Sequence, residues 1–159
     1  MGETMQDIVI YYSETGNTEK LARAVADGME CQAVSILAIA PGAVASYDHV
    51  CFCCPVQGWR PAPKMLMYIA RLEPVGRKRA ATAFTMHLFG ASRAAGKMRD
   101  ALESKGYAVN GSYSCFGWSR LVANFGPRVF MRGHPDAAEL EKAAAFGRRF
   151  RQELPGFSG

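Results

Sequence analysis

The residues with the clearest chemical signature lie near the start of the chain. An apolar run at residues 8–12 leads directly into Ser13-Glu14-Thr15-Gly16-Asn17-Thr18, and a helical pattern follows at once. Backbone N–H groups in the first turn of a helix lack intrahelical partners and carry partial positive charge, so hydroxyl donors and one glycine can complete an anion site without a basic side chain. The sequence therefore predicts a phosphate-binding loop. An ordinary strand-to-helix turn, which also favours Ser, Thr, Asn and Gly, is the alternative.

The elements that must position this loop alternate between strand and helix along the whole chain. Strands are expected at residues 7–12, 32–37, 49–54, 81–89 and 107–116, with Ser92 capping the helix after the fourth and Pro135-Asp136 opening the last helix. A chain of 159 residues is short for two domains, so we predict one domain over residues 1–159. Its fold class is α/β, a doubly wound five-stranded parallel sheet of order 2-1-3-4-5 with helices on both faces. Ligands of such sheets bind beside the point where strand order reverses, which selects the loops after the first, third and fourth strands.

The loop at residues 13–18 resembles the phosphate loop of the flavodoxin family, which has the form S/T-x-T-G-N-T, and it matches all six positions. The resemblance extends to the order and length of the other elements and implies a flavodoxin-like fold. It also implies that FMN, rather than FAD, is the cofactor. The residues implied at its phosphate are Ser13, Glu14, Thr15, Gly16, Asn17 and Thr18.

The resemblance also implies where the flavin ring would lie. One wall of the ring site falls on Pro55, Val56, Gln57, Gly58 and Trp59, with Trp59 stacking on the ring and Gly58 as the peptide that reorients on reduction. The other side falls on His87, Leu88, Phe89 and Gly90. A partly buried core tryptophan is the alternative for Trp59. His87 could donate to a flavin carbonyl or be satisfied within its strand.

Five cysteines without disulfide-framework spacing indicate free thiols in a reducing compartment. Cys51, Cys53 and Cys54 invite a metal interpretation, but strand alternation puts Cys54 on the opposite face from the other two. We therefore predict core thiols and no metal site.

The net charge of +5 is concentrated in the middle of the chain, where residues 49–135 hold 13 of the 19 Lys and Arg and only 3 of the 14 acids. Flavodoxins are commonly acidic around the flavin, so this chain differs in the sign of its charge from the family that it resembles. We expect redox partner proteins with an acidic docking surface and no nucleic acid, although solvated helix faces could also explain the charge. A monomer or weak dimer is expected.

No stretch approaches the length of an apolar membrane span, and no leader-like pattern opens the sequence, so the expected location is the cytoplasm. Residues 117–132 contain Trp118, Arg120 and Arg128 and no acid. This long segment could cover the flavin edge or dock a partner.

The sequence favours an FMN-binding electron carrier without catalytic residues, because nothing resembles a G-x-G-x-x-G nicotinamide motif. A small FMN-dependent oxidoreductase of the NAD(P)H, quinone or tetrapyrrole type is the nearest alternative. A remote one is a phosphatase, because Cys54 and Arg60 have the C-x5-R spacing. A cofactor-free binding module is a third class.

Overall fold

The computed structural model describes residues 4–87, 89–117 and 133–153. The elements are, in order, β1 (Asp7–Tyr11), α1 (Asn17–Met29), β2 (Gln32–Ser35), the 3-10 helix η1 (Pro41–Ser46), β3 (His49–Gln57), β4 (Arg60–Pro61), α2 (Pro63–Ala70), β5 (Lys78–Met86), α3 (Ala91–Glu103), β6 (Tyr107–Phe116) and α4 (Ala137–Gln152). The parallel strands follow the order β2-β1-β3-β5-β6, and β4 pairs antiparallel with β3 alone. The predicted doubly wound sheet is therefore confirmed, and the two-residue β4 is an addition that pairs with the carboxyl end of the central strand β3.

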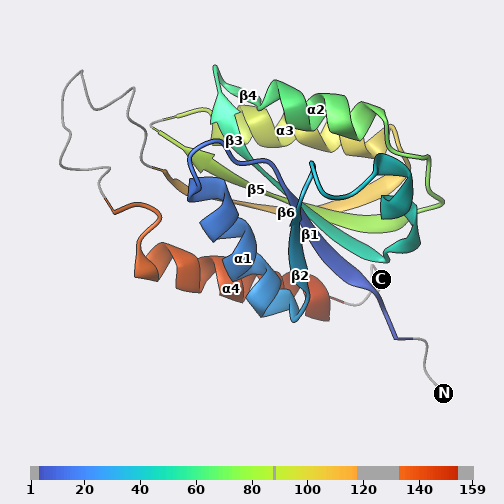
Figure 1. Cartoon of the computed structure of the whole chain (residues 1–159), viewed down its shortest axis with the longest axis horizontal. Coiled ribbons are helices and arrows are strands. Elements are labelled where there is room, and N and C mark those ends of the chain that lie inside the picture. Colours follow the sequence, from blue (N-terminus) through green and yellow to red (C-terminus); the bar gives the residue numbers. More distant parts are fainter. Residues whose placement is uncertain (1–3, 88, 118–132, 154–159) are drawn as a thin grey trace, which may run out of the picture.

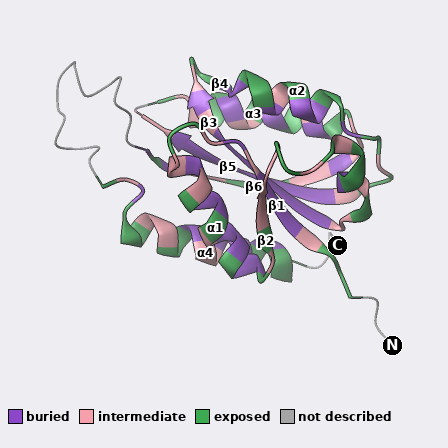
Figure 2. Ribbon diagram, viewed as in Figure 1, coloured by how far each residue is buried: buried purple, intermediate pink, exposed green. Residues whose placement is uncertain are grey.

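Helices cover both faces of the sheet, α1 and α4 on one and α2 and α3 on the other (Figure 1). Buried residues concentrate in the strands and on the inner sides of the helices (Figure 2). Alternate residues of one strand serve opposite layers, since Ile8 and Ile10 of β1 pack with the α2/α3 side and Val9 with the α1/α4 side. Burial on both faces explains why the strands read as continuous apolar runs. No helix in the described part of the chain has both the length and the apolar character needed to cross a bilayer.

The cysteines of β3 are distributed as the alternation predicts. Cys51 and Cys53 face the α1/α4 layer with their Sγ atoms 3.9 Å apart, whereas Cys54 faces the α2/α3 layer. All three are fully buried. Burial raises the pKa of Cys53 well above its usual value, so its thiol stays protonated within the core.

Two strands differ in extent from the sequence prediction. β3 continues three residues past Cys54 because Pro55 lies where only its carbonyl is needed, accepting from the N–H of Ala62 at 3.0 Å. β5 runs from Lys78 to Met86 rather than over residues 81–89. The sequence prediction missed the start of β5 because Lys78 and Arg79 are charged and so do not resemble a buried strand. In the structure Arg79 is buried, and its guanidinium lies 5.0 Å from the ring centre of Phe150.

The two predicted helix starts have different outcomes. α3 begins one residue before Ser92, and its N-cap is Gly90 at φ +102° without a side-chain cap. A Cβ at Gly90 would lie 3.0 Å from the Cα of Trp59, so the close approach of two chain segments, not a capping hydroxyl, determines this helix start. α4 begins as predicted, after Asp136, whose carboxylate accepts from the N–H of Glu139 at 2.8 Å in a capping box.

Candidate functional site

The loop between β1 and α1 presents hydrogen-bond donors and contains no basic side chain. The N-cap of α1 is Gly16, at φ +90° and without a side-chain cap, so the first N–H groups of the helix are oriented toward the loop. Ser13 Oγ accepts from the N–H of Gly16 at 3.1 Å, and Thr15 Oγ1 accepts from Asn17 Nδ2 at 3.1 Å. Because each hydroxyl accepts these bonds, its own hydrogen remains to be donated to a ligand. The geometry can hold an anion by N–H and O–H donors.

A buried hydroxyl pair fixes this loop to the middle of the sheet. Thr18 Oγ1 and Thr85 Oγ1 lie 2.7 Å apart, and both residues are almost fully buried. Gly117, directly after β6, closes the same corner, since a Cβ there would lie 3.2 Å from Thr85 Cβ and 3.4 Å from Asn17 Cβ. Thr85 and Gly117 were not among the predicted site residues. The signal that could have found them is topological, because parallel strands end at the same edge of the sheet.

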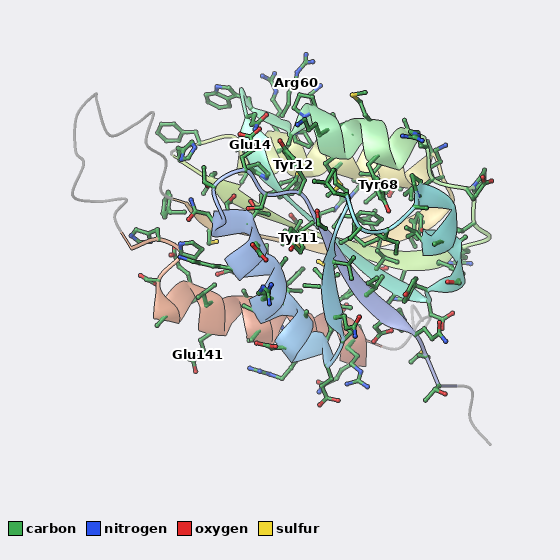
Figure 3. The ribbon with its side chains drawn as sticks, in the orientation of Figure 1. Tyr11, Tyr12, Glu14, Arg60, Tyr68 and Glu141 are labelled. Atoms are coloured by element: carbon green, nitrogen blue, oxygen red, sulfur yellow. The ribbon has the colours of Figure 1, made fainter. Side chains whose placement is uncertain are left out.

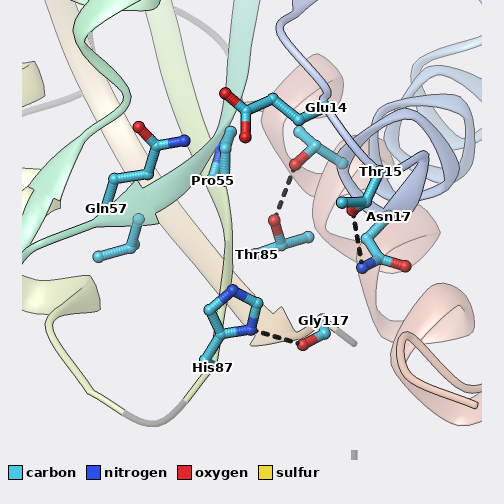
Figure 4. A pocket seen from close by; sticks show the side chains of 10 residues that line it. Glu14, Thr15, Asn17, Pro55, Gln57, Thr85, His87 and Gly117 are labelled. Atoms are coloured by element: carbon cyan, nitrogen blue, oxygen red, sulfur yellow. Dashed lines mark hydrogen bonds between the residues drawn. The ribbon is translucent and has the colours of Figure 1, made fainter. Parts of the chain in front are cut away.

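The ends of these strands enclose a cavity of about 200 Å³ (Figure 4). Its lining consists of Glu14, Thr15, Asn17, Thr18, Pro55, Val56, Gln57, Thr85, His87 and Gly117. The cavity thus brings together residues from all three predicted loops, after β1, β3 and β5. Predicted site residues outside the lining are Ser13, Gly16, Gly58, Trp59, Phe89 and Gly90. Leu88 lies outside the described residues, as do residues 118–132.

His87 has one ring nitrogen committed to the protein. Nδ1 lies 2.9 Å from the carbonyl oxygen of Gly117, which can only accept, so Nδ1 carries a proton. In the neutral ring Nε2 is then an acceptor, and in the charged ring it is a donor. Figure 4 shows the ring on the cavity wall opposite Glu14, so His87 is satisfied at one nitrogen and still presents the other edge to the cavity.

Glu14 places a carboxylate on the cavity wall and is hydrogen-bonded to the residue that directly follows β1. Its Oε1 accepts from the Tyr12 hydroxyl at 2.7 Å (Figure 3). This hydrogen bond, together with burial, raises the pKa of Tyr12 to about 12, so the phenol stays protonated. Lys64 Nζ lies 5.4 Å from the centre of the Tyr12 ring, within cation–π range. A cation from α2 therefore lies beside the loop without joining it.

The segment predicted as a loop after Cys54 is a tight hairpin. Gln57 pairs with Arg60, and the two residues between them, Gly58 and Trp59, have φ values of +56° and +66°. Positive φ at both central positions is the requirement of a type I′ turn, where Asn and Gly are usual and a bulky residue is a steric outlier. The hairpin therefore holds Trp59 in a strained backbone conformation.

Trp59 is exposed rather than part of the core. Its side chain is 54% exposed and stacks on Phe89, with ring centres 6.2 Å apart and an interplanar angle of 15°. The core alternative for Trp59 is wrong. The two rings lie too close to hold a flavin between them, because a sandwich needs roughly 7 Å at normal contact distances.

The phosphatase spacing has no matching chemistry in the structure. Cys54 is fully buried, and burial raises its pKa to about 12, whereas a nucleophilic cysteine needs a lowered pKa and access to substrate. Arg60 lies on the exposed side of the hairpin. These features exclude Cys54 as the nucleophile.

One group of potential metal ligands occurs within the described residues, outside the cavity: His134, Asp136 and Glu139. Glu139 Oε2 accepts from His134 Nδ1 at 2.6 Å and from the N–H of Asp136 at 2.8 Å. Its Oε1 accepts from the N–H of Phe116 at 3.2 Å. The cluster thus anchors the start of α4 to the end of β6.

Comparisons with known proteins agree with this fold. A family model described as a flavodoxin domain matches residues 8–123. An uncharacterized protein of Methanocaldococcus jannaschii is 23% identical over 91% of this chain and 97% of its own length. A flavodoxin from the domain Archaea has a similar structure, with a TM-score of 0.71 and 16% identity over 92% of this chain and 96% of that one. A flavoprotein of Lactobacillus acidophilus, solved in complex with FMN, superposes with a TM-score of 0.56 and 15% identity over 70% of this chain and 93% of that one.

Proposed function

The chain belongs to the flavodoxin family, and we propose that it binds FMN at the cavity and carries electrons, one or two at a time, between redox proteins. The observation that carries this proposal is a loop of N–H and O–H donors at the carboxyl edge of the parallel sheet, where it borders the cavity. The FMN held by the structurally similar Lactobacillus acidophilus flavoprotein supports the choice of cofactor.

The residues present fit a phosphate monoester. Ser13 and Thr15 would donate their hydroxyl hydrogens, and the first N–H groups of α1 would complete the set. The cavity of about 200 Å³ is smaller than the roughly 300–1,000 Å³ of pockets that enclose a whole ligand. It would therefore enclose the phosphate end and leave the ring near the surface.

The ring would then lie toward the exposed hairpin. Trp59 would contact it with the face or edge that Phe89 leaves uncovered, and the Gly58 peptide would lie beside it. Bound FMN supplies reversible one- and two-electron chemistry. His87, held at Nδ1 by Gly117, would offer Nε2 to a ring N–H when neutral and donate from it when charged.

The test is to purify the chain, record its visible spectrum and identify the extracted cofactor by chromatography. We expect a yellow protein that releases one FMN per chain and rebinds it after removal. A colourless chain that fails to bind added FMN would overturn the proposal.

The same preparation distinguishes a carrier from an oxidoreductase. A carrier should be reduced by a photoreductant and pass electrons to a protein acceptor without oxidising NADH or NADPH by itself. Steady consumption of either nucleotide by the pure protein would instead support the enzyme alternative.

A further inference from the structure

We propose that the exposed surface around the hairpin turn docks an acidic redox protein. The inference rests on the proposed electron-transfer function and names the class of partner. We call this area the basic aromatic surface and define it by the following residues: Trp59, Arg60, Lys64, Phe89, Arg93 and Lys97.

The centre of this surface is apolar. Trp59 and Phe89 are 54% and 70% exposed, yet their rings stack in parallel on each other. Trp59 also occupies a left-handed backbone position that Gly or Asn would hold with less strain. Because the fold buries little of this side chain in return, the strain points to a functional contact, and the part of the aromatic pair that the flavin ring leaves uncovered remains for a partner. Large aromatic residues at the centre of a polar rim are typical of protein interfaces.

The surrounding charges come from three elements that meet at this turn. Arg60 is the first residue of β4, directly after Trp59, and projects outward from the α2/α3 side (Figure 3). Lys64 lies in the first turn of α2. Arg93 and Lys97 lie in the first two turns of α3, four residues apart and so on one side of the helix, and the N-cap of α3 abuts the backbone of Trp59.

Local stability does not explain these charges. Cations near a helix N-terminus oppose the helix dipole, and like charges four residues apart repel each other. No ion pair within the described ranges involves Arg60, Lys64, Arg93 or Lys97. The acids of α3, Asp100 and Glu103, lie at its other end. The positive charge of this surface thus lowers the stability of the helices that carry it.

Charge complementarity then identifies the occupant as a protein with clustered carboxylates. Such a protein would be steered to the cavity mouth by the cations and held by the aromatic pair. In the transfer that follows docking, the reduced partner loses one electron and the flavin gains it. Neither a membrane nor a nucleic acid supplies that electron, which favours a protein.

The test measures binding of the FMN-loaded chain by calorimetry at low and high salt. The probe is an oxidised acidic [2Fe–2S] ferredoxin, and basic cytochrome c serves as the opposite-charge probe. The test variant is Arg93→Glu with Lys97→Glu. The matched control, Lys142→Glu with Arg148→Glu, makes the same change of net charge on exposed positions of α4, in the other helix layer.

We expect the native chain to bind ferredoxin more tightly than cytochrome c, with an affinity that falls as salt rises. The test variant should weaken ferredoxin binding by about tenfold, ~1.4 kcal/mol, while the control stays within about twofold. The proposal would be refuted by an equal loss of ferredoxin affinity in both variants, by no loss in either, or by tighter binding of the native chain to cytochrome c. Tighter binding to phosphatidylserine vesicles or to a DNA duplex, lost in the test variant alone, would assign the surface to another partner and also refute it. Failure of the FMN proposal is visible separately, as a colourless protein.

Discussion

Replacement of Thr15 by valine tests the phosphate loop most directly. Thr15 lines the cavity, and its Oγ1 accepts from Asn17 Nδ2, so its own hydrogen is left for the ligand. A hydrogen bond to a charged group contributes roughly 1.5–3 kcal/mol. Thr15→Val should therefore weaken FMN binding about 10- to 150-fold. Riboflavin, which lacks the phosphate, should change by less than about threefold, and Asn17→Ala should show the same selectivity.

The assay is titration of the apoprotein with each flavin, followed by the change in flavin fluorescence. Thr15→Ser is the control, because it keeps the hydroxyl and should retain native affinity for FMN. If Thr15→Val weakened FMN and riboflavin equally, the loop would not be the phosphate site. Loss of FMN binding in Thr15→Ser would show that the β-methyl, and not the hydroxyl, matters.

Three further predictions follow from particular contacts. The indole of Trp59 should quench the bound flavin, so Trp59→Ala should raise the emission of flavin that stays bound; an unchanged yield would place Trp59 away from the ring. Reversing the charges of Arg60 and Lys64 to Glu should make the potential for full reduction of the flavin more negative, because negative charge disfavours the reduced anion. We expect a change on the order of tens of millivolts in a redox titration. No shift would show that these charges do not act on the flavin. Because burial raises the pKa of Cys54 to about 12, this thiol should resist iodoacetamide in the folded protein at pH 8 and react only as pH rises toward 12 or the chain unfolds. If mass spectrometry found Cys54 alkylated in the native chain at pH 8, its burial in the core would be contradicted.

The sequence was sufficient to predict the topology and the place of the cavity. Alternating patterns specify a parallel sheet, and the switch in strand order then brings the loops after β1, β3 and β5 to one edge. The phosphate role of residues 13–18 stays a prediction, made from residue types that favour an anion at a helix start. Cys54 could also be assigned to its face, because strand alternation is a local rule.

The features that were missed depend on tertiary contacts. Thr85 contributes to the cavity wall and pairs its hydroxyl with that of Thr18, which lies 67 positions away in the chain. The residues next to Thr85 in the sequence do not indicate this partner. Ser92 has the right chemistry for a cap, but the helix starts earlier because Gly90 packs against Trp59. The exposed stack of Trp59 on Phe89 likewise depends on a two-residue turn, which the sequence Gln-Gly-Trp-Arg does not predict.

Under the proposed function, the distribution of charge assigns cofactor binding and partner binding to different residues. The loop at residues 13–18 offers neutral donors, so the proposed phosphate would not need the nearby cations to hold it. Lys64 borders both regions, since it lies over Tyr12, which donates to Glu14 at the cavity wall. Reversal of Arg60 and Lys64 should therefore affect both the flavin potential and the docking of an acidic protein. Reversal of the two cations on α3 should affect docking more than the potential, because Lys64 lies over Tyr12 beside the cavity wall, whereas no described contact joins Arg93 or Lys97 to the cavity lining. If both pairs changed the potential equally, the charges would act as a general field and not as two regions.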